Sequence, residues 1–197
     1  MKRCIGLTGN SGAGKSTVAE YLKELGADII DADEISHELC DVGAEGYAAV
    51  TKAFGEKFLR ADRSLDRRAL GAYVFADEEA LSRLNAILHP LVIKEVRRRK
   101  AESQKEVVVI DCALLVEVGL AEDADEIWLV RADTKNKEKR ICRRDNIDAQ
   151  YACRRLKNQQ SDDELERYAD VVIANDDTVE ELKKQVKGYY YEQSGKR

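Results

Sequence analysis

Residues 9–16 constrain the fold of this chain more than any other segment. They read Gly-Asn-Ser-Gly-Ala-Gly-Lys-Ser, which matches the phosphate-binding loop pattern G-x-x-x-x-G-K-S. The segment before it, residues 4–8, is short and apolar and contains β-branched side chains. The segment after it, residues 15–25, carries apolar side chains at helical spacing. This strand–loop–helix context predicts a nucleotide-binding α/β fold that begins near the first residue of the chain.

The residue types in this loop suit an anion. Glycines allow the backbone to turn tightly, so that successive N–H groups point at one phosphate, and the helix that follows adds its positive N-terminus. Lys15 is expected to reach the outer phosphates, and the Ser16 hydroxyl to ligate Mg²⁺. The candidate ATP-binding residues of this segment are Gly9, Asn10, Ser11, Gly12, Ala13, Gly14, Lys15, Ser16 and Thr17.

Length and composition exclude several classes of protein. A chain of 197 residues with a net charge of −5 suits one α/β core with insertions and gives no general reason to expect nucleic-acid or membrane binding. No apolar run approaches the roughly 18 residues of a membrane span, and no secretory segment is apparent. The five cysteines are odd in number and lack a C-x-x-C pair, so reduced thiols are expected. We therefore expect a cytoplasmic protein. A monomer or weak oligomer is expected as well, although the sequence does not fix the oligomeric state.

Five apolar, β-branched runs predict five strands, at residues 4–8, 27–31, 107–110, 127–130 and 171–174. Continuous runs of this kind are typical of strands that are buried on both faces, as in a parallel sheet covered by helices. Helical patterns separate the runs. The sequence therefore predicts a doubly wound, five-stranded parallel sheet of the P-loop kinase type.

Two gaps between these strands are too long for simple crossovers, and the first of them looks mostly helical. Within the first gap, Pro90 interrupts a helical pattern, so one helix is expected to stop near Leu88 and another to begin at His89. The predicted parts are a nucleotide-binding core at 1–34, 105–132 and 169–197, a helical insertion at 35–104, and a lid at 133–168.

The lid segment is strongly basic. Residues 135–157 contain nine basic and three acidic side chains, a net charge of +6 within an acidic chain. Arg140 and Arg144 are four residues apart and would share one face of a helix. A solvated basic helix is the alternative to a lid that closes over phosphates, and the clustering favours the lid. Ser161 and Glu164 form a capping-box pattern that predicts another helix start.

Two aspartates follow predicted strands at the edge where ligands bind in open parallel sheets. Asp33 could act as a general base for an acceptor hydroxyl, or as the N-cap of a helix beginning near Glu34, and the two roles are compatible. Asp31 is the alternative residue for the cap or for the sheet edge. Asp111 ends the apolar run at 107–110, as in the Walker B pattern, where a carboxylate orients Mg²⁺, often through water. Ser16 and Asp111 are therefore the candidate metal ligands.

With these features in place, the chain resembles the dephospho-coenzyme A kinase family, which phosphorylates the ribose 3′-hydroxyl of dephospho-CoA in the last step of CoA synthesis. The phosphate loop is generic, but three further motifs in this order are specific: Asp-Ala-Asp, Leu-His-Pro and Asp-x-x-Leu-Leu-x-Glu. The matching segments are residues 7–9, 31–33, 65–70, 84–90, 111–120, 140, 144–145, 155–159 and 169–175.

The resemblance implies a three-part kinase, in which residues 35–104 are the helical CoA-substrate domain, and it also implies site residues and co-substrates. It implies that Asp33 is the general base, that Arg140 is a phosphate-contacting catalytic residue alongside Lys15, and that Arg144 and Asn175 lie near the adenine of ATP. It implies ATP with Mg²⁺ and no tightly bound organic cofactor, with ATP and dephospho-CoA as the small-molecule partners. The candidate substrate-binding residues are Asp33, Arg67, His89 and Leu114.

Two positions depart from the family pattern, and three other functions compete with it. Ala113 stands where the family usually has proline, and Val116 where an aromatic residue is common, so one wall of the acceptor pocket is expected to be less aromatic. A GTPase would need a D-x-x-G motif, which the chain lacks. A nucleoside-monophosphate kinase lacks the family-specific segments. A non-catalytic ATP-binding module would have no need of Asp33 or the arginine lid.

Overall fold

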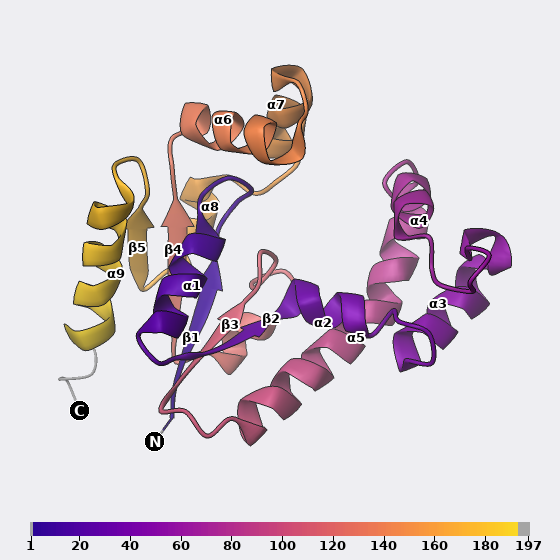
Figure 1. The fold of residues 1–197 in the computed structure, drawn as a ribbon, viewed down its shortest axis with the longest axis horizontal. Coiled ribbons are helices and arrows are strands. Elements are labelled where there is room, and N and C mark those ends of the chain that lie inside the picture. Colours follow the sequence, from indigo (N-terminus) through magenta and orange to yellow (C-terminus); the bar gives the residue numbers. More distant parts are fainter. Residues whose placement is uncertain (1, 193–197) are drawn as a thin grey trace. The chain divides into compact units, whose positions relative to one another are not determined.

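The fold is built on one five-stranded sheet in the computed structural model, which describes residues 2–192 (Figure 1). The strand order is β2-β3-β1-β4-β5, with β1 parallel to both β3 and β4, and β4 parallel to β5. The predicted five-stranded parallel sheet of P-loop kinase type is confirmed. The strands are β1 (Arg3–Thr8), β2 (Asp28–Asp31), β3 (Val107–Asp111), β4 (Glu126–Arg131) and β5 (Val171–Ala174).

Two helices cover one face of this sheet, α1 (Lys15–Glu24) and α9 (Val179–Glu192) (Figure 1). Their apolar side chains pack with those of the strands into one buried core, because each strand presents alternate residues to that face. Fully buried members include Val18 of α1, Val186 of α9 and Trp128 of β4. The helix that follows the phosphate loop is thus anchored through its apolar side.

The chain divides into two compact units. The first comprises residues 1–30 and 103–197 and contains the sheet. The second comprises residues 31–102 and has its own apolar core. The division into core, helical domain and lid stays a prediction. The other helices of the first unit are α6 (Thr134–Asp145), α7 (Ala149–Lys157), α8 (Asp162–Glu166) and a 3₁₀ turn (Leu120–Asp123); those of the second are α2 (Ala32–Glu38), α3 (Glu45–Phe54), α4 (Arg67–Val74), α5 (Glu78–Glu102) and a 3₁₀ turn (Glu56–Phe58).

The expected helix break at Pro90 is wrong. Helix α5 runs unbroken for 25 residues with Pro90 in its interior. Proline removes one backbone hydrogen bond and crowds the preceding turn, but packing can offset that cost. Here α5 contacts α2, α3 and α4 and buries Ala80 on one side of the proline and Val92 and Val96 on the other. Tertiary packing on both sides of Pro90 therefore keeps the helix continuous.

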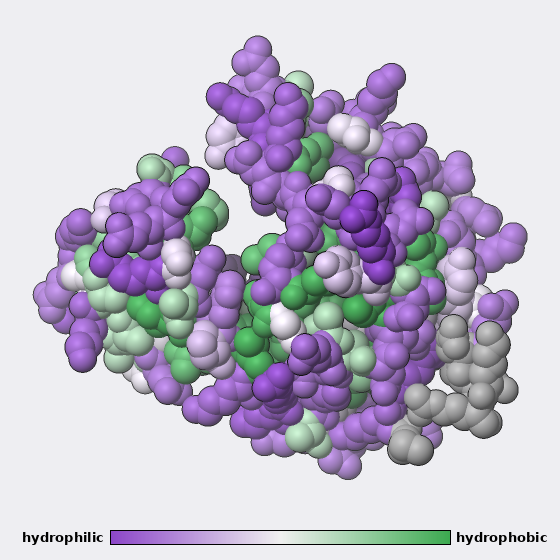
Figure 2. Space-filling view, turned by 180° about the vertical axis from the view of Figure 1, so that it is seen from behind, coloured by the Kyte–Doolittle hydropathy of each residue, from purple (hydrophilic) through white to green (hydrophobic). Residues whose placement is uncertain are grey.

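The surface is largely polar. Figure 2 shows hydrophilic residues over most of the face that it draws, with smaller hydrophobic areas between them. No helix among residues 2–192 is both long enough and apolar enough to cross a membrane. All five cysteines are free thiols in the described part of the chain, three of them buried.

Candidate functional site

The phosphate loop connects the end of β1 to the start of α1, and two of its glycines cannot be replaced without strain. Gly12 and Gly14 have φ angles of +78° and +99°, a left-handed conformation that L side chains rarely adopt. A Cβ atom on Gly12 would lie 2.6 Å from the Lys137 carbonyl oxygen, and one on Gly14 would lie 2.0 Å from Nδ2 of Asn175. Both the backbone conformation and the close neighbours require glycine at these positions.

The loop presents backbone amides that the protein itself does not use. The Ala13 amide donates to the Asn10 carbonyl oxygen at 3.0 Å and closes a turn. Other loop amides have no hydrogen-bond acceptor among the described residues. These are the amides of Gly12, Gly14, Lys15 and Ser16. Together with the N-terminus of the ten-residue helix α1, they form a set of donors suited to a phosphate group.

Strand register brings Asp111 to the phosphate loop. Leu7 of β1 pairs with Asp111, the last residue of β3, and the ammonium group of Lys15 forms an ion pair with Oδ1 of Asp111. The Asp111 carboxylate is buried, with 5 % of its side chain exposed. Carboxylate and hydroxyl oxygens are the ligands that Mg²⁺ prefers, so Asp111 and Ser16 at the helix start are chemically suited to hold this ion together with ATP phosphates and water.

Arg140 and Asn175 lie against the outer side of the same loop. Nη1 of Arg140 donates to the carbonyl oxygens of Gly12 at 3.2 Å and Ala13 at 3.3 Å, and Nη2 donates to the Asn175 carbonyl oxygen at 2.8 Å. Nδ2 of the buried Asn175 donates to the Ala13 carbonyl oxygen at 2.7 Å. The loop carbonyls are thus satisfied from outside, which leaves the amides free.

Arg144 lies one helical turn after Arg140 and has a different partner. Its guanidinium group makes two hydrogen bonds to the Asp145 carboxylate, at 2.7 and 2.9 Å, and Arg155 of α7 donates to the same carboxylate at 2.7 Å. The two arginines hold the pKa of Asp145 below its usual range, and Arg144 makes the larger contribution. Asp145 therefore pairs with one arginine of α6 and one of α7, and the described contacts do not connect Arg144 to the phosphate loop.

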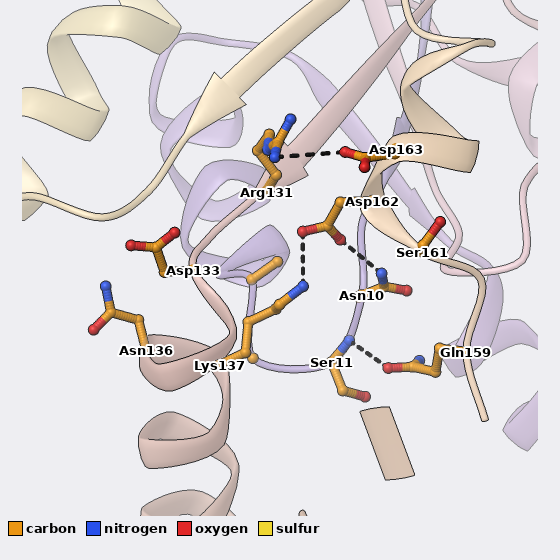
Figure 3. A network of polar contacts seen from close by, with 12 residues as sticks. Asn10, Ser11, Arg131, Asp133, Asn136, Lys137, Gln159, Ser161, Asp162 and Asp163 are labelled. Atoms are coloured by element: carbon orange, nitrogen blue, oxygen red, sulfur yellow. Dashed lines mark hydrogen bonds and ion pairs between the residues drawn. The ribbon is translucent and has the colours of Figure 1, made fainter. Parts of the chain in front are cut away.

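Three residues that contact the phosphate loop were not among the candidates. Lys137, Gln159 and Asp162 surround its first half (Figure 3). In the sequence, Lys137 is one of the nine basic residues at 135–157, and Asp162 lies between the two capping-box residues. The capping box itself is confirmed at Ser161 and Glu164. One signal was present, because Lys137 lies three residues before Arg140 and so shares its face of α6.

Asp33 belongs to the second unit, near the start of α2. Oδ1 of Asp31 accepts hydrogen bonds from the amides of Asp33 at 2.8 Å and Glu34 at 3.0 Å, so Asp31 is the N-cap. The alternative role of Asp33 as N-cap is therefore wrong, because the helix begins two residues earlier than expected. Asp33 is exposed, and its carboxylate has no hydrogen-bond or ion-pair partner among residues 2–192.

The remaining candidate substrate-binding residues lie apart in the chain. In the second unit, Nη2 of Arg67 donates to the His37 carbonyl oxygen at 2.7 Å and pairs with Asp41 at 2.8 Å. His89 lies within α5, and partial burial lowers the pKa of its imidazole, which favours the neutral form. In the first unit, Leu114 follows β3 and is 46 % exposed. Each of the three side chains is at least partly exposed.

Comparison with known proteins supports a single family. A family model described as dephospho-CoA kinase matches residues 3–181. A dephospho-CoA kinase from Geobacter metallireducens is 42 % identical over 185 residues, covering 92 % of each chain. The crystal structure of TT1252 from Thermus thermophilus has a TM-score of 0.84 at 29 % identity and covers 98 % of this chain and 99 % of its own. A dephospho-CoA kinase structure from Campylobacter jejuni has a TM-score of 0.71 at 27 % identity and covers 98 % of each chain.

Proposed function

The chain belongs to the dephospho-CoA kinase family, and from this premise we propose how its residues divide the reaction between them. The enzyme transfers the γ-phosphoryl group of ATP to the ribose 3′-hydroxyl of dephospho-CoA and releases CoA and ADP, the last step of CoA biosynthesis. The observation that carries the residue assignment is the loop with unpaired amides next to the Lys15–Asp111 pair.

The phosphate loop holds the donor. The unpaired amides of Gly12, Gly14, Lys15 and Ser16 bind the β- and γ-phosphates, with the side chain of Lys15 on the outer oxygens. Ser16 and Asp111 would hold the Mg²⁺ that accompanies ATP, with Asp111 acting directly or through water. When bound, this ion neutralises charge on the phosphate oxygens. Lys15 then exchanges part of its contact with Asp111 for phosphate oxygens.

Asp33 is the general base. Its carboxylate takes the proton of the ribose 3′-hydroxyl, and that oxygen forms a bond to the γ-phosphorus. The bond between the γ-phosphorus and the β–γ bridging oxygen breaks, and its electron pair leaves with ADP. Two observations support this role: Asp33 is exposed, and its carboxylate is not consumed by the helix cap, which Asp31 supplies.

The basic helix α6 supports the transferring phosphoryl group. Arg140 already contacts the loop carbonyls at Gly12 and Ala13, which supports a position beside the donor. Arg144 and Asn175 are assigned to the nucleotide end of the site. Arg67, His89 and Leu114, together with Asp33, are assigned to dephospho-CoA. The protein acts on small molecules in the cytoplasm, as a monomer or weak oligomer.

A coupled ADP-release assay tests the acceptor. The purified enzyme is given Mg-ATP with dephospho-CoA, with AMP, with CMP or with no acceptor. The proposal expects ADP release that depends on dephospho-CoA. Equal or greater turnover with AMP or CMP would instead indicate a nucleoside-monophosphate kinase. ATP binding without turnover on any acceptor would indicate a non-catalytic ATP-binding module.

A further inference from the structure

An ion pair lies almost buried between the lid and the phosphate loop. Nζ of Lys137, in the first turn of α6, lies 2.7 Å from Oδ2 of Asp162, the first residue of α8, and their side chains are 8 % and 11 % exposed. Lysine and aspartate are rarely buried to this degree unless they are paired. Most charges on the lid helices are exposed and can be explained by solubility. The burial of this pair needs another explanation.

Asp162 also binds the phosphate loop directly. Nδ2 of Asn10 donates to Oδ1 of Asp162 at 2.7 Å and to the carbonyl oxygen of Gln160 at 2.9 Å, which accounts for both hydrogens of that amide group (Figure 3). Next to it, the Ser11 amide donates to Oε1 of Gln159 at 3.1 Å. Residues 159–162 therefore hold the first half of the loop through side chain and backbone.

Helix α6 contacts the middle of the loop, at Gly12 and Ala13. The Lys137 carbonyl oxygen approaches Gly12 closely, and Arg140 donates to the Gly12 carbonyl. Asp162 is the residue that joins both sets of contacts, because one carboxylate oxygen bonds to Asn10 and the other to Lys137. The loop and the start of α6 are thereby fixed relative to each other by a single carboxylate.

Such a connection matters because the loop binds phosphate only with its amides aimed at one point. Several parallel N–H dipoles repel one another, so the arrangement persists only if other contacts hold it. We propose that Asp162 is a positioning residue for ATP binding: it holds the phosphate loop and helix α6 in register, so that the amides of the loop and Arg140 of α6 meet the same phosphates. The inference rests on the proposed function of this loop as the ATP site.

The neighbouring Asp163 supplies a matched control. It occupies the same first turn of α8, carries the same charge, and is 86 % exposed with only a 3.8 Å contact to Arg131 (Figure 3). Asp162→Ala is expected to raise the Kd for Mg-ATP by about tenfold or more, as misplacement of a preorganised site does. The KM for dephospho-CoA at saturating ATP should stay near that of wild type. Asp163→Ala should change neither value by more than about twofold.

A second variant separates positioning from stability. Asp162→Ala leaves the Lys137 ammonium without its carboxylate, which can destabilise the fold and weaken ATP binding indirectly. Replacing both charges, with Lys137→Met and Asp162→Leu together, removes that problem because well-packed apolar residues often substitute for a buried ion pair at no cost. The double variant should melt close to wild type but still bind Mg-ATP weakly, since Asn10 has lost its acceptor.

Calorimetric titration of Mg-ATP into the folded double variant decides the inference. A Kd raised by about tenfold, with the melting temperature kept, supports a positioning role. A wild-type Kd in the double variant overturns it, and so does a wild-type Kd in Asp162→Ala. Failure of the wild-type protein to bind Mg-ATP would instead overturn the proposed function. If the double variant does not fold, Asn10→Ala, which keeps the ion pair, must show the same loss, and a wild-type Kd there overturns the inference.

Discussion

Arg140 donates a hydrogen bond to the carbonyl oxygen of Gly12, at 3.2 Å, so the basic helix α6 touches the phosphate loop itself. The sequence predicts that Arg140 and Arg144 share one face of a helix. In the structure, Arg140 supports the loop from outside, whereas Arg144, one turn later, is held by Asp145. The two arginines of one helical face therefore have different local tasks.

Arg140 should be far more important than an ordinary surface arginine. Arg140→Ala is expected to lower kcat/KM by about a hundredfold or more, because arginine contacts to a transferring phosphoryl group reach about 10³–10⁵ in rate. Arg140→Lys should also be damaging, since lysine lacks the planar fork that meets several acceptors. Steady-state kinetics and melting temperatures measured together would separate catalysis from stability.

The control for this experiment is Arg143 of α6, which is exposed and makes no side-chain hydrogen bond or ion pair with the described residues of the phosphate loop. Arg143→Ala should be close to wild type, because isolated surface charges contribute roughly 0–1 kcal/mol. If Arg140→Ala and Arg143→Ala prove equally mild, α6 is a solvated basic helix and its catalytic role must be abandoned.

Lys15→Ala should both weaken ATP binding and slow the chemical step. Its ammonium group is expected to contact phosphate oxygens in the ground state and in the transition state. Calorimetry should show a Kd for Mg-ATP raised by about tenfold or more, the loss of one charge-assisted contact. Lys23→Ala, in the exposed last turn of the same helix, serves as the control. An unchanged Mg-ATP affinity in Lys15→Ala would remove the basis for this nucleotide site.

Protonation of Glu95 in acid should destabilise the second unit. Hydrogen bonds from Arg98 and Arg99 lower the pKa of Glu95 to about 2, from an ordinary value of 4.5. Because the folded pKa is the lower one, Glu95 stabilises the fold fully above pH 4.5, and this contribution is lost as the pH falls toward 2. Glu95→Gln should therefore melt below wild type at about pH 6, with the difference shrinking in acid. Thermal unfolding of both proteins across this range checks it; a difference independent of pH would contradict it.

Much of the fold was predictable because its signals are local. Buried parallel strands require continuous apolar runs. The predicted ends of the five strands therefore lie within a residue or two of the observed ends. The phosphate loop was predictable because glycine is required at Gly12 and Gly14 by backbone conformation. The capping box at Ser161 involves residues only three apart. In each case, physics within a few residues decides the structure.

The features that the sequence did not predict depend on packing between residues that are far apart in the chain. Pro90 favours a helix end by local rules, yet α5 continues because both of its halves pack against other helices. The Lys137–Asp162 pair joins residues separated by 25 positions and depends on how α6 and α8 meet. Nothing in the sequence distinguishes Lys137 from its basic neighbours except its spacing from Arg140. Buried polar contacts of this kind are a tertiary property.

The proposed role of Asp33 is to activate the ribose 3′-hydroxyl, and the substitution Asp33→Asn tests this role most directly. A general base contributes about 10²–10⁴ in rate, so Asp33→Asn should lower kcat by that factor while the Kd for Mg-ATP stays near wild type. Glu34→Gln, the next exposed residue of α2, removes the same charge and should leave kcat within about twofold of wild type. The kcat of Asp33→Asn with saturating Mg-ATP and dephospho-CoA is therefore the decisive measurement. A loss of about a hundredfold or more is predicted, and retention of more than about half of the wild-type value would contradict the account.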